Sequence, residues 1–177
     1  MTRSIKSALK VSLLSALAIA PVLLSVNGAS AQDKGAPGSY VGAGVTYGIT
    51  NGGAGENTNN INGNIVGRIA VPKTQFSVRG QVTYTDKTST ITPTLTYDLP
   101  VAKNTNVIVG AGYSLTQKDA TTTTAQGNKD HVNLTVGAER QFGQNLVGYG
   151  KVDVGIKAFQ NSNTPSVAPS VGLGLKF

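Results

Sequence analysis

The chain contains no cysteine, only one histidine and no run of basic residues. The absence of cysteine excludes a disulfide framework, thiolate zinc sites and catalysis by a thiol. Beyond the first thirty-one residues, no stretch is long and apolar enough for a membrane-spanning helix. The formal net charge of +7 includes Arg3, Lys6 and Lys10 at the very start, so the remaining positive bias is too weak to predict a nucleic-acid partner.

The N-terminal residues have the layout of an export signal. A positively charged start is followed by an apolar stretch over residues 11–26, and Ala29 and Ala31 form the small-x-small pattern that a signal peptidase recognises. The alternative is an uncleaved N-terminal membrane helix, but Pro21 and the small-residue exit favour cleavage. We therefore predict a cleaved signal peptide over residues 1–31.

The rest of the chain is rich in Gly, Thr, Val and Asn and alternates with a period of two residues. Eight segments each carry apolar side chains on one face and small or polar side chains on the other. Each is close to the roughly ten residues that a tilted strand needs to cross the hydrocarbon core of a membrane. The segments are Tyr40–Ile49, Asn60–Val71, Phe76–Thr85, Thr90–Leu99, Asn106–Thr116, His131–Phe142, Leu146–Ala158 and Val167–Phe177.

The connections between these segments alternate in length, with the turn at 86–89 as the exception. Short periplasmic turns and longer outer loops are typical of outer-membrane barrels. The predicted fold is therefore all-β: an eight-stranded antiparallel up-and-down transmembrane β-barrel over residues 40–177, after a short periplasmic segment at 32–39. An even number of strands brings both termini to one side, which we expect to be the periplasm. The short turns are 72–75, 100–105 and 143–145; the longer loops are 50–59, 117–130 and 159–166.

Aromatic residues of the apolar faces gather near the ends of the segments. Two such belts are typical of the two membrane interfaces, whereas a soluble barrel would hold the same rings in its core. Their position at strand ends favours the membrane. The predicted outer belt contains Tyr47, Tyr84 and the slightly deeper Tyr113, and the predicted periplasmic belt contains Phe76, Tyr97, Phe142 and Phe177.

The last strand carries the one specific family motif. It alternates through Leu173 and Leu175 and ends in Phe177, which resembles the assembly signal of bacterial outer-membrane proteins. Together with the export signal and the eight segments, the chain resembles the small OmpA/OmpX-like barrels, without the peptidoglycan-binding domain that follows the barrel in OmpA itself. This resemblance implies an outer-membrane location, contact with outer-membrane lipid and recognition by the barrel-assembly machinery through the C-terminal strand.

Several charged side chains are predicted to point into the lumen. If the turn at 72–75 pairs Val71 with Phe76, Arg68 lies directly opposite Arg79, which is unfavourable unless a counter-charge is near. Counting along the other strands adds acidic and basic residues, and OmpA-like barrels hold a comparable interior network. We predict a charge cluster in the periplasmic half of the lumen, formed by Arg68, Arg79, Asp98, Glu139, Lys151, Asp153 and Lys176.

Three further features bear on alternative functions. With Lys157 also counted as inward, basic residues outnumber acidic ones, so a pore through this barrel would prefer anions. Small outer-membrane barrels that act as lipid-modifying enzymes carry a surface histidine, but here His131 lies beside Asp130 at a loop base without a serine placed near it. Glu56, Asp119 and Asp130 are too scattered for a calcium site.

We therefore expect no enzyme and no cofactor or metal, and the leading function is a structural barrel that displays surface loops, with a ligand possible at those loops. A narrow, weakly anion-preferring porin-like channel is the first alternative. A soluble periplasmic barrel that binds an apolar ligand is the second.

Two residues fit the pattern of alternating faces poorly. Arg140 falls on the lipid face, next to the expected periplasmic boundary. Pro93 predicts either a bulge in its strand or a later start of that strand.

Overall fold

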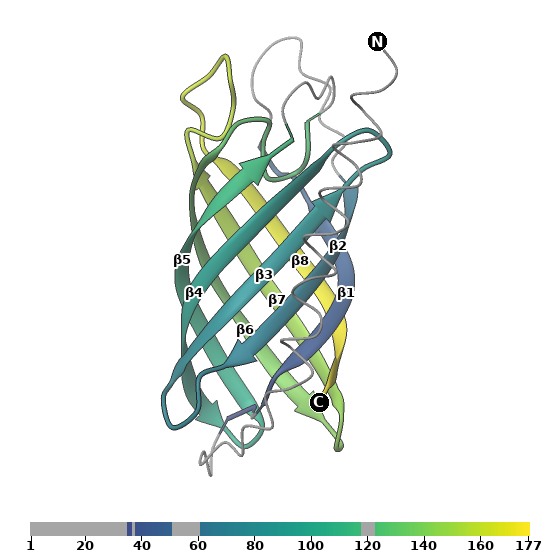
Figure 1. Ribbon diagram of the computed structural model, residues 1–177, viewed down its shortest axis with the longest axis vertical. Helices are drawn as coiled ribbons and strands as arrows, with labels where there is room; N and C mark the ends of the chain where they lie inside the picture. The colour runs from purple at the N-terminus through teal and green to yellow at the C-terminus, as the bar shows by residue number, and fades with distance from the viewer. Residues whose placement is uncertain (1–34, 37, 51–60, 118–122) are drawn as a thin grey trace.

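The computed structural model describes residues 35–36, 38–50, 61–117 and 123–177. The predicted signal peptide with Ala29 and Ala31 lies outside the described residues, as do Glu56 and Asp119. Eight antiparallel strands close into one barrel in chain order, with the last strand beside the first (Figure 1). They are β1 (Tyr40–Tyr47), β2 (Ile61–Ala70), β3 (Phe76–Tyr84), β4 (Ser89–Ala102), β5 (Thr105–Thr116), β6 (His131–Phe142), β7 (Leu146–Ile156) and β8 (Ser166–Lys176). The predicted fold class, an eight-stranded antiparallel up-and-down barrel, is confirmed.

Each strand has an inner face of mainly polar or small residues and an outer face that is mainly apolar. In β4, Thr92, Thr94 and Thr96 are buried, whereas Leu95 and Tyr97 between and beyond them are exposed. β-branched residues such as threonine and valine suit this pleated surface, and the period of two sends them to opposite sides. The described part of the chain forms no helix that is long and apolar enough to cross a membrane.

The two ends of the barrel differ in their connections. Tyr40 pairs with Lys176, so the chain enters and leaves the barrel at the same end, which we call the terminus end (Figure 1, lower part). The connections at this end are short, and Lys73, Asn104 and Gly143 turn the chain there with φ angles of 62°, 61° and 64°. The opposite end, which we call the loop end, carries the connections at 48–60, 85–88, 117–130 and 157–165.

The prediction for Pro93 was wrong. Strand β4 begins at Ser89, earlier than expected, and the register with β5 is the same before Pro93, where Ile91 pairs with Leu115, and after it, where Thr94 pairs with Gly112. The register shifts instead between Pro100 and Ala102, close to the turn. A proline in a strand removes one ladder donor, and a ring closed by seven further strand pairs tolerates that loss without a bulge.

The predicted inward position of Lys157 was also wrong. Strand β7 ends at Ile156, and Lys157 takes a φ angle of 57°, which turns the chain out of the strand. The alternation of faces stops at that point, and the side chain of Lys157 is exposed.

Candidate functional site in the lumen

Two arginines face each other on neighbouring strands inside the barrel. The register of β2 and β3 places Arg68 opposite Arg79, and both side chains are buried. Asp98 reaches them from β4 and Glu139 from β6, and each carboxylate is only 1% exposed. We call these four residues the tetrad.

Each arginine of the tetrad binds both carboxylates. Arg68 lies 2.7 Å from Asp98 and 3.3 Å from Glu139, and Arg79 lies 2.9 Å from each. The four charges therefore form a closed ring with no net charge. Opposite charges at these distances in a buried site attract strongly, which offsets the unfavourable pairing of Arg68 with Arg79 across the two strands.

Neutral side chains satisfy the remaining hydrogen-bonding capacity of the tetrad. The hydroxyl of Ser77 donates to Asp98 and accepts from Arg68, and Arg79 donates to Thr96 over 3.0 Å. Tyr40 donates to Glu139 and accepts from Arg79. Asn106 donates to Glu139 over 2.9 Å. A buried ionic network is stable only when such partners complete it.

The segment before β1 covers the tetrad at the terminus end. The carbonyl oxygens of Ala36 and Gly38 accept hydrogen bonds from Arg68, and Ala36 also exchanges two hydrogen bonds with the side chain of Asn106. Gly35 donates to the carbonyl of Ala102. These hydrogen bonds tie the described part of the segment to the tetrad and to β4 and β5.

The other predicted members of the charge cluster lie apart from the tetrad. Lys151 and Asp153 form a separate pair at 2.6 Å, closer to the loop end. Asp153 also accepts hydrogen bonds from Asn133 and Thr135. Lys176 is half-buried at the terminus end, where it contacts Gln141 over 3.4 Å. The seven-residue cluster of the prediction is therefore one group of four, one pair and one separate lysine, because strand position sets the height of each side chain.

Within the part of the chain that the structure describes, the buried charges of the lumen balance, and the cavity between its charged groups is small. Among the described residues, the buried charged side chains are three cations and three carboxylates, namely Arg68, Arg79, Lys151, Asp98, Glu139 and Asp153. Between the tetrad and the Lys151–Asp153 pair lies a cavity of about 10 Å³, which has room for one water molecule. The excess of inward basic residues that predicted anion preference is absent among these buried groups.

His131 is the first residue of β6, and its side chain is buried. Its Nδ1 atom lies 2.7 Å from the carbonyl oxygen of Lys129, while the carboxylate of Asp130 accepts a hydrogen bond from the amide of Thr116. The neighbouring Asp130 is thus turned away to the backbone of β5. Within the described ranges, no group of three or more acidic, histidine or cysteine side chains is arranged to hold a metal ion.

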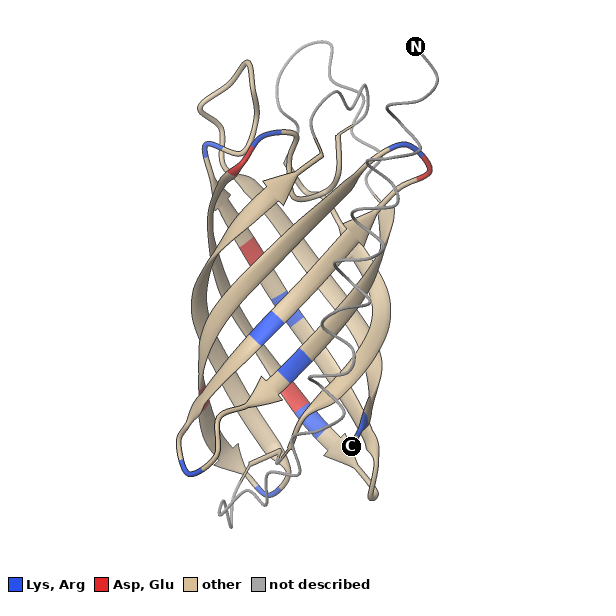
Figure 2. Ribbon diagram, viewed as in Figure 1, with Lys and Arg blue, Asp and Glu red and all other residues tan. Residues whose placement is uncertain are grey.

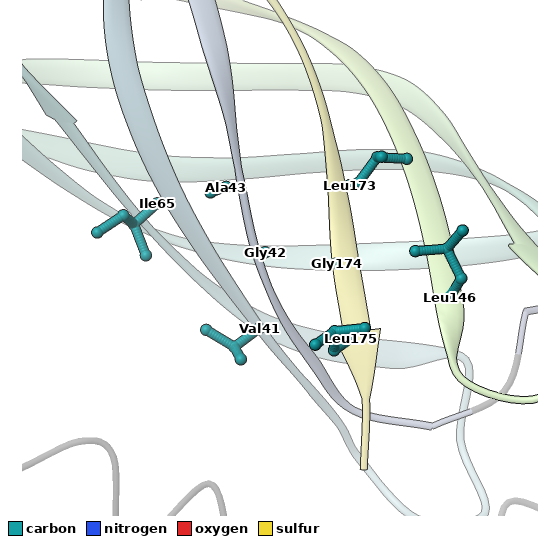
Figure 3. Close-up of a pocket in the computed structure, with 8 residues that line it drawn as sticks. All are labelled: Val41, Gly42, Ala43, Ile65, Leu146, Leu173, Gly174 and Leu175. Atoms are coloured by element: carbon teal, nitrogen blue, oxygen red, sulfur yellow. The ribbon is translucent and has the colours of Figure 1, made fainter.

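The outer wall of the barrel is apolar over most of its height. Charged residues lie at the two ends of the barrel and on a few strand segments between them (Figure 2). Over the seam of β1 and β8, Gly42 and Gly174 floor a groove of about 470 Å³ between Val41, Leu173 and Leu175 (Figure 3). The predicted belt residues are all on the outer face: Tyr47, Tyr84, Tyr113, Phe76, Tyr97, Phe142 and Phe177.

Arg140 and the C-terminal motif also lie on the outer face. Arg140 is exposed near the terminus end, with its guanidinium 5.7 Å from the ring centre of Phe142. Leu173, Leu175 and Phe177 of the C-terminal motif are 57%, 63% and 40% exposed. These side chains therefore contact the surroundings of the barrel and not its interior.

The sequence analysis did not single out several residues that hydrogen-bond to the buried charges of the lumen, among them Tyr40, Ser77, Asn106 and Gln126. Tyr40, Ser77 and Asn106 fall on the inner face by the same alternation that identified Arg68 and Asp98, so the pattern contained their signal. Gln126 comes from the β5–β6 connection, where no periodicity exists to place it. Its side chain is nevertheless buried at the loop end, where it donates to Asp153.

No protein-family model and no curated protein sequence matches the chain. Solved structures do resemble it. Neisserial surface protein A is 18% identical over 80% of this chain and 98% of that chain, with a TM-score of 0.53. The N-terminal β-barrel domain of OprF from Pseudomonas aeruginosa is 10% identical over 78% and 97%, with a TM-score of 0.53.

A third similar structure is Ail, the attachment invasion locus protein of Yersinia pestis, in complex with the heparin analogue sucrose octasulfate. It is 12% identical over 78% of this chain and 97% of that chain, with a TM-score of 0.52. At these identities the likeness concerns the fold. The chain therefore has the fold of the small eight-stranded barrels of bacterial outer membranes.

Proposed function

We propose that this protein is an integral outer-membrane barrel with a closed lumen, which acts as a membrane scaffold and presents its loops at one end. The observation that carries this proposal is the inverted surface: apolar side chains cover the outside, and most of the buried side chains inside are hydroxyl, amide and charged groups. A protein in water buries its apolar face, whereas a strand barrel in lipid exposes it.

The orientation and the partners form part of the same proposal. The terminus end faces the periplasm and the loop end faces outward, as in barrels with short inner turns and longer outer loops. Leu173, Leu175 and Phe177 serve as the signal for the barrel-assembly machinery. A surface ligand would meet the polar rim, where Lys129, Gln160 and Asn163 line a hollow of about 310 Å³.

The balanced, closely packed lumen favours this scaffold over the two alternatives. A porin-like channel needs a continuous aqueous path, and a cavity of about 10 Å³ beside Arg79 and Lys151 offers none there. A soluble carrier of an apolar ligand needs an apolar cavity, whereas the described lumen is lined mainly by threonine, serine, asparagine and charged residues.

A charge on the outer wall tests the proposal. Val136 is 50% exposed in the middle of β6, where it pairs with Val109 and Val152. Val136→Arg should destabilise the barrel in phospholipid vesicles by about 2–4 kcal/mol, because arginine near the middle of the bilayer is costly. Urea unfolding, followed by heat-modifiable gel migration, measures this loss.

Gln160→Arg is the matched control, since Gln160 is exposed at the loop end and outside the proposed hydrocarbon zone. It should leave the unfolding midpoint unchanged. If Val136→Arg inserted and unfolded like the parent protein, or if the parent stayed in the soluble fraction of cells, the membrane proposal would be wrong.

A further inference from the structure

Part of the β5–β6 connection, residues 123–127, lies in the mouth of the barrel at the loop end. Residues 123–127, which we call the plug segment, make a tight turn in which Thr124 and Gly127 exchange backbone hydrogen bonds of 3.3 Å and 2.9 Å. All five residues are buried, and Gln126 is only 1% exposed. A connection at the open end of a barrel would ordinarily lie on the surface.

The plug segment contacts strands on opposite sides of the lumen. Gln126 donates to Asp153 of β7 over 3.2 Å and accepts from the hydroxyl of Thr92 of β4 over 3.1 Å. The amide of Ala125 donates to the side chain of Asn62 of β2. The hydroxyl of Thr124 lies 2.9 Å from that of Thr90. These contacts span the mouth of the barrel.

The plug segment is held by polar contacts that the barrel does not need for its own closure. The strand ladders are complete without it, and each hydrogen bond of this kind contributes about 0.5–1.5 kcal/mol. When Gln126 leaves, Asp153 keeps Lys151, Asn133 and Thr135 as partners. Departure therefore leaves no unpaired charge behind.

The lumen beneath the plug segment favours the entry of water. The side-chain oxygens of Gln81 and Asn133 are buried and have no hydrogen-bond partner. Both residues are at least nine-tenths buried. A buried acceptor without a partner is costly, and hydration through an opened mouth would remove that cost.

From these contacts we propose that residues 123–127 form a releasable plug, held by the carboxamide of Gln126, that closes the loop-end mouth of the lumen. Its release opens a blind vestibule lined by amide and hydroxyl groups. The tetrad remains as the floor, so release admits water and small solutes from the loop end without creating a channel. This goes beyond the scaffold function and does not depend on which side of the membrane the loop end faces.

A single introduced cysteine reports whether the mouth is open. The chain has no cysteine, and Ser114 is a near-isosteric site: it is fully buried and bonds to Thr92, which also holds Gln126. Ser114→Cys in the folded protein in lipid nanodiscs should react slowly with a small, charged, water-soluble thiol reagent. Lys87→Cys on the exposed β3–β4 turn supplies the rate of a freely accessible thiol.

Adding Gln126→Glu to the Ser114→Cys protein should accelerate labelling about tenfold or more, because a carboxylate replaces the amide donor beside Asp153. Gln144→Glu, the same change on the exposed turn at the terminus end, should leave the rate unchanged. Combining Gln126→Glu with Asp153→Asn should restore slow labelling, since the asparagine amide can donate to the new carboxylate. Thr124→Val, which removes the hydroxyl bonded to Thr90 without adding charge, should act in the same direction as Gln126→Glu.

Heat-modifiable gel migration identifies the folded variants, and only these are compared. Faster labelling of folded Gln126→Glu or Thr124→Val, with Gln144→Glu unchanged, supports the plug. The proposal is overturned if Ser114→Cys reacts as fast as Lys87→Cys in the parent background. It is equally overturned if neither plug variant changes the labelling rate.

Discussion

At the scale of single residues, the tetrad shows how like charges are accommodated inside a narrow barrel. Arg68 and Arg79 lie side by side only because Asp98 and Glu139 each bind both of them. Two cations and two carboxylates cancel, and Ser77, Thr96, Asn106 and Tyr40 complete the hydrogen bonds. Removing one member leaves a buried charge without compensation, which costs more than the whole network contributes.

Glu139→Gln tests this dependence. The amide keeps the shape of the side chain but leaves two arginines with one carboxylate, so the free energy of unfolding should fall by about 3–5 kcal/mol. Urea titration in detergent or vesicles measures it. Asp86→Asn on the exposed β3–β4 turn removes a carboxylate of no structural consequence and should have no effect. An equal, small change in both variants would show that the tetrad charges are not coupled.

At the scale of strands, the closure of the ring depends on glycines along the seam of β1 and β8. Gly42 pairs with Gly174 and Gly44 with Gly172, all on the inner side of the seam. A Cβ atom on Gly172 would lie 2.3 Å from the hydroxyl of Tyr149 and 2.4 Å from the carbonyl of Ala43. The small residues therefore give the inward ring of Tyr149 its space and let the two strands approach.

Gly172→Ala should accordingly lower the free energy of unfolding by about 1–3 kcal/mol, as overpacking of a filled interior does. Gly150→Ala is the matched control, because a Cβ atom at that outer-face glycine meets nothing within 4 Å. Unfolding midpoints of the two variants in the same lipid decide the matter. If Gly150→Ala were the more harmful change, steric closure at the seam would not explain the glycines.

At the scale of the whole molecule, we propose that the barrel is closed at two levels. The segment around Ala36 and the tetrad close the terminus half, and the plug segment closes the loop end. Between them the buried charges balance. An eight-stranded barrel is normally just wide enough to be filled by its own side chains, and this interior follows that rule despite its many glycines.

We therefore expect no sustained ion conduction when the purified protein is added to a planar lipid bilayer. The reason is that the tetrad and its cover block the lumen regardless of the plug. Current recordings at both polarities measure this directly. The Gln126→Glu variant, in which only the loop-end mouth opens, should also conduct no current. Stable single-channel openings of the parent protein would contradict the proposed closed lumen, and anion selectivity in them would restore the porin-like alternative.

The alternation of apolar and polar residues predicted most of the strands and the side chains that face outward. Strand β6 begins and ends where its pattern predicted, and the outward position of the belt residues follows from the same parity. The predictions for Pro93 and Lys157 failed because local rules for proline and for strand length do not include the neighbouring strands. The ring holds β4 in register through Pro93, and a left-handed residue ends β7 before Lys157.

The sequence by itself determined which face of each strand is apolar, and hence that Arg68, Arg79, Asp98 and Glu139 point inward. This is so because side-chain direction in a strand depends only on parity. Only the tertiary structure decided which of the inward charged side chains form ion pairs, and that Gln126 bonds to one of them, Asp153. Height in the lumen depends on strand register around the whole ring, and the position of residues 123–127 depends on partners that are far away in the chain.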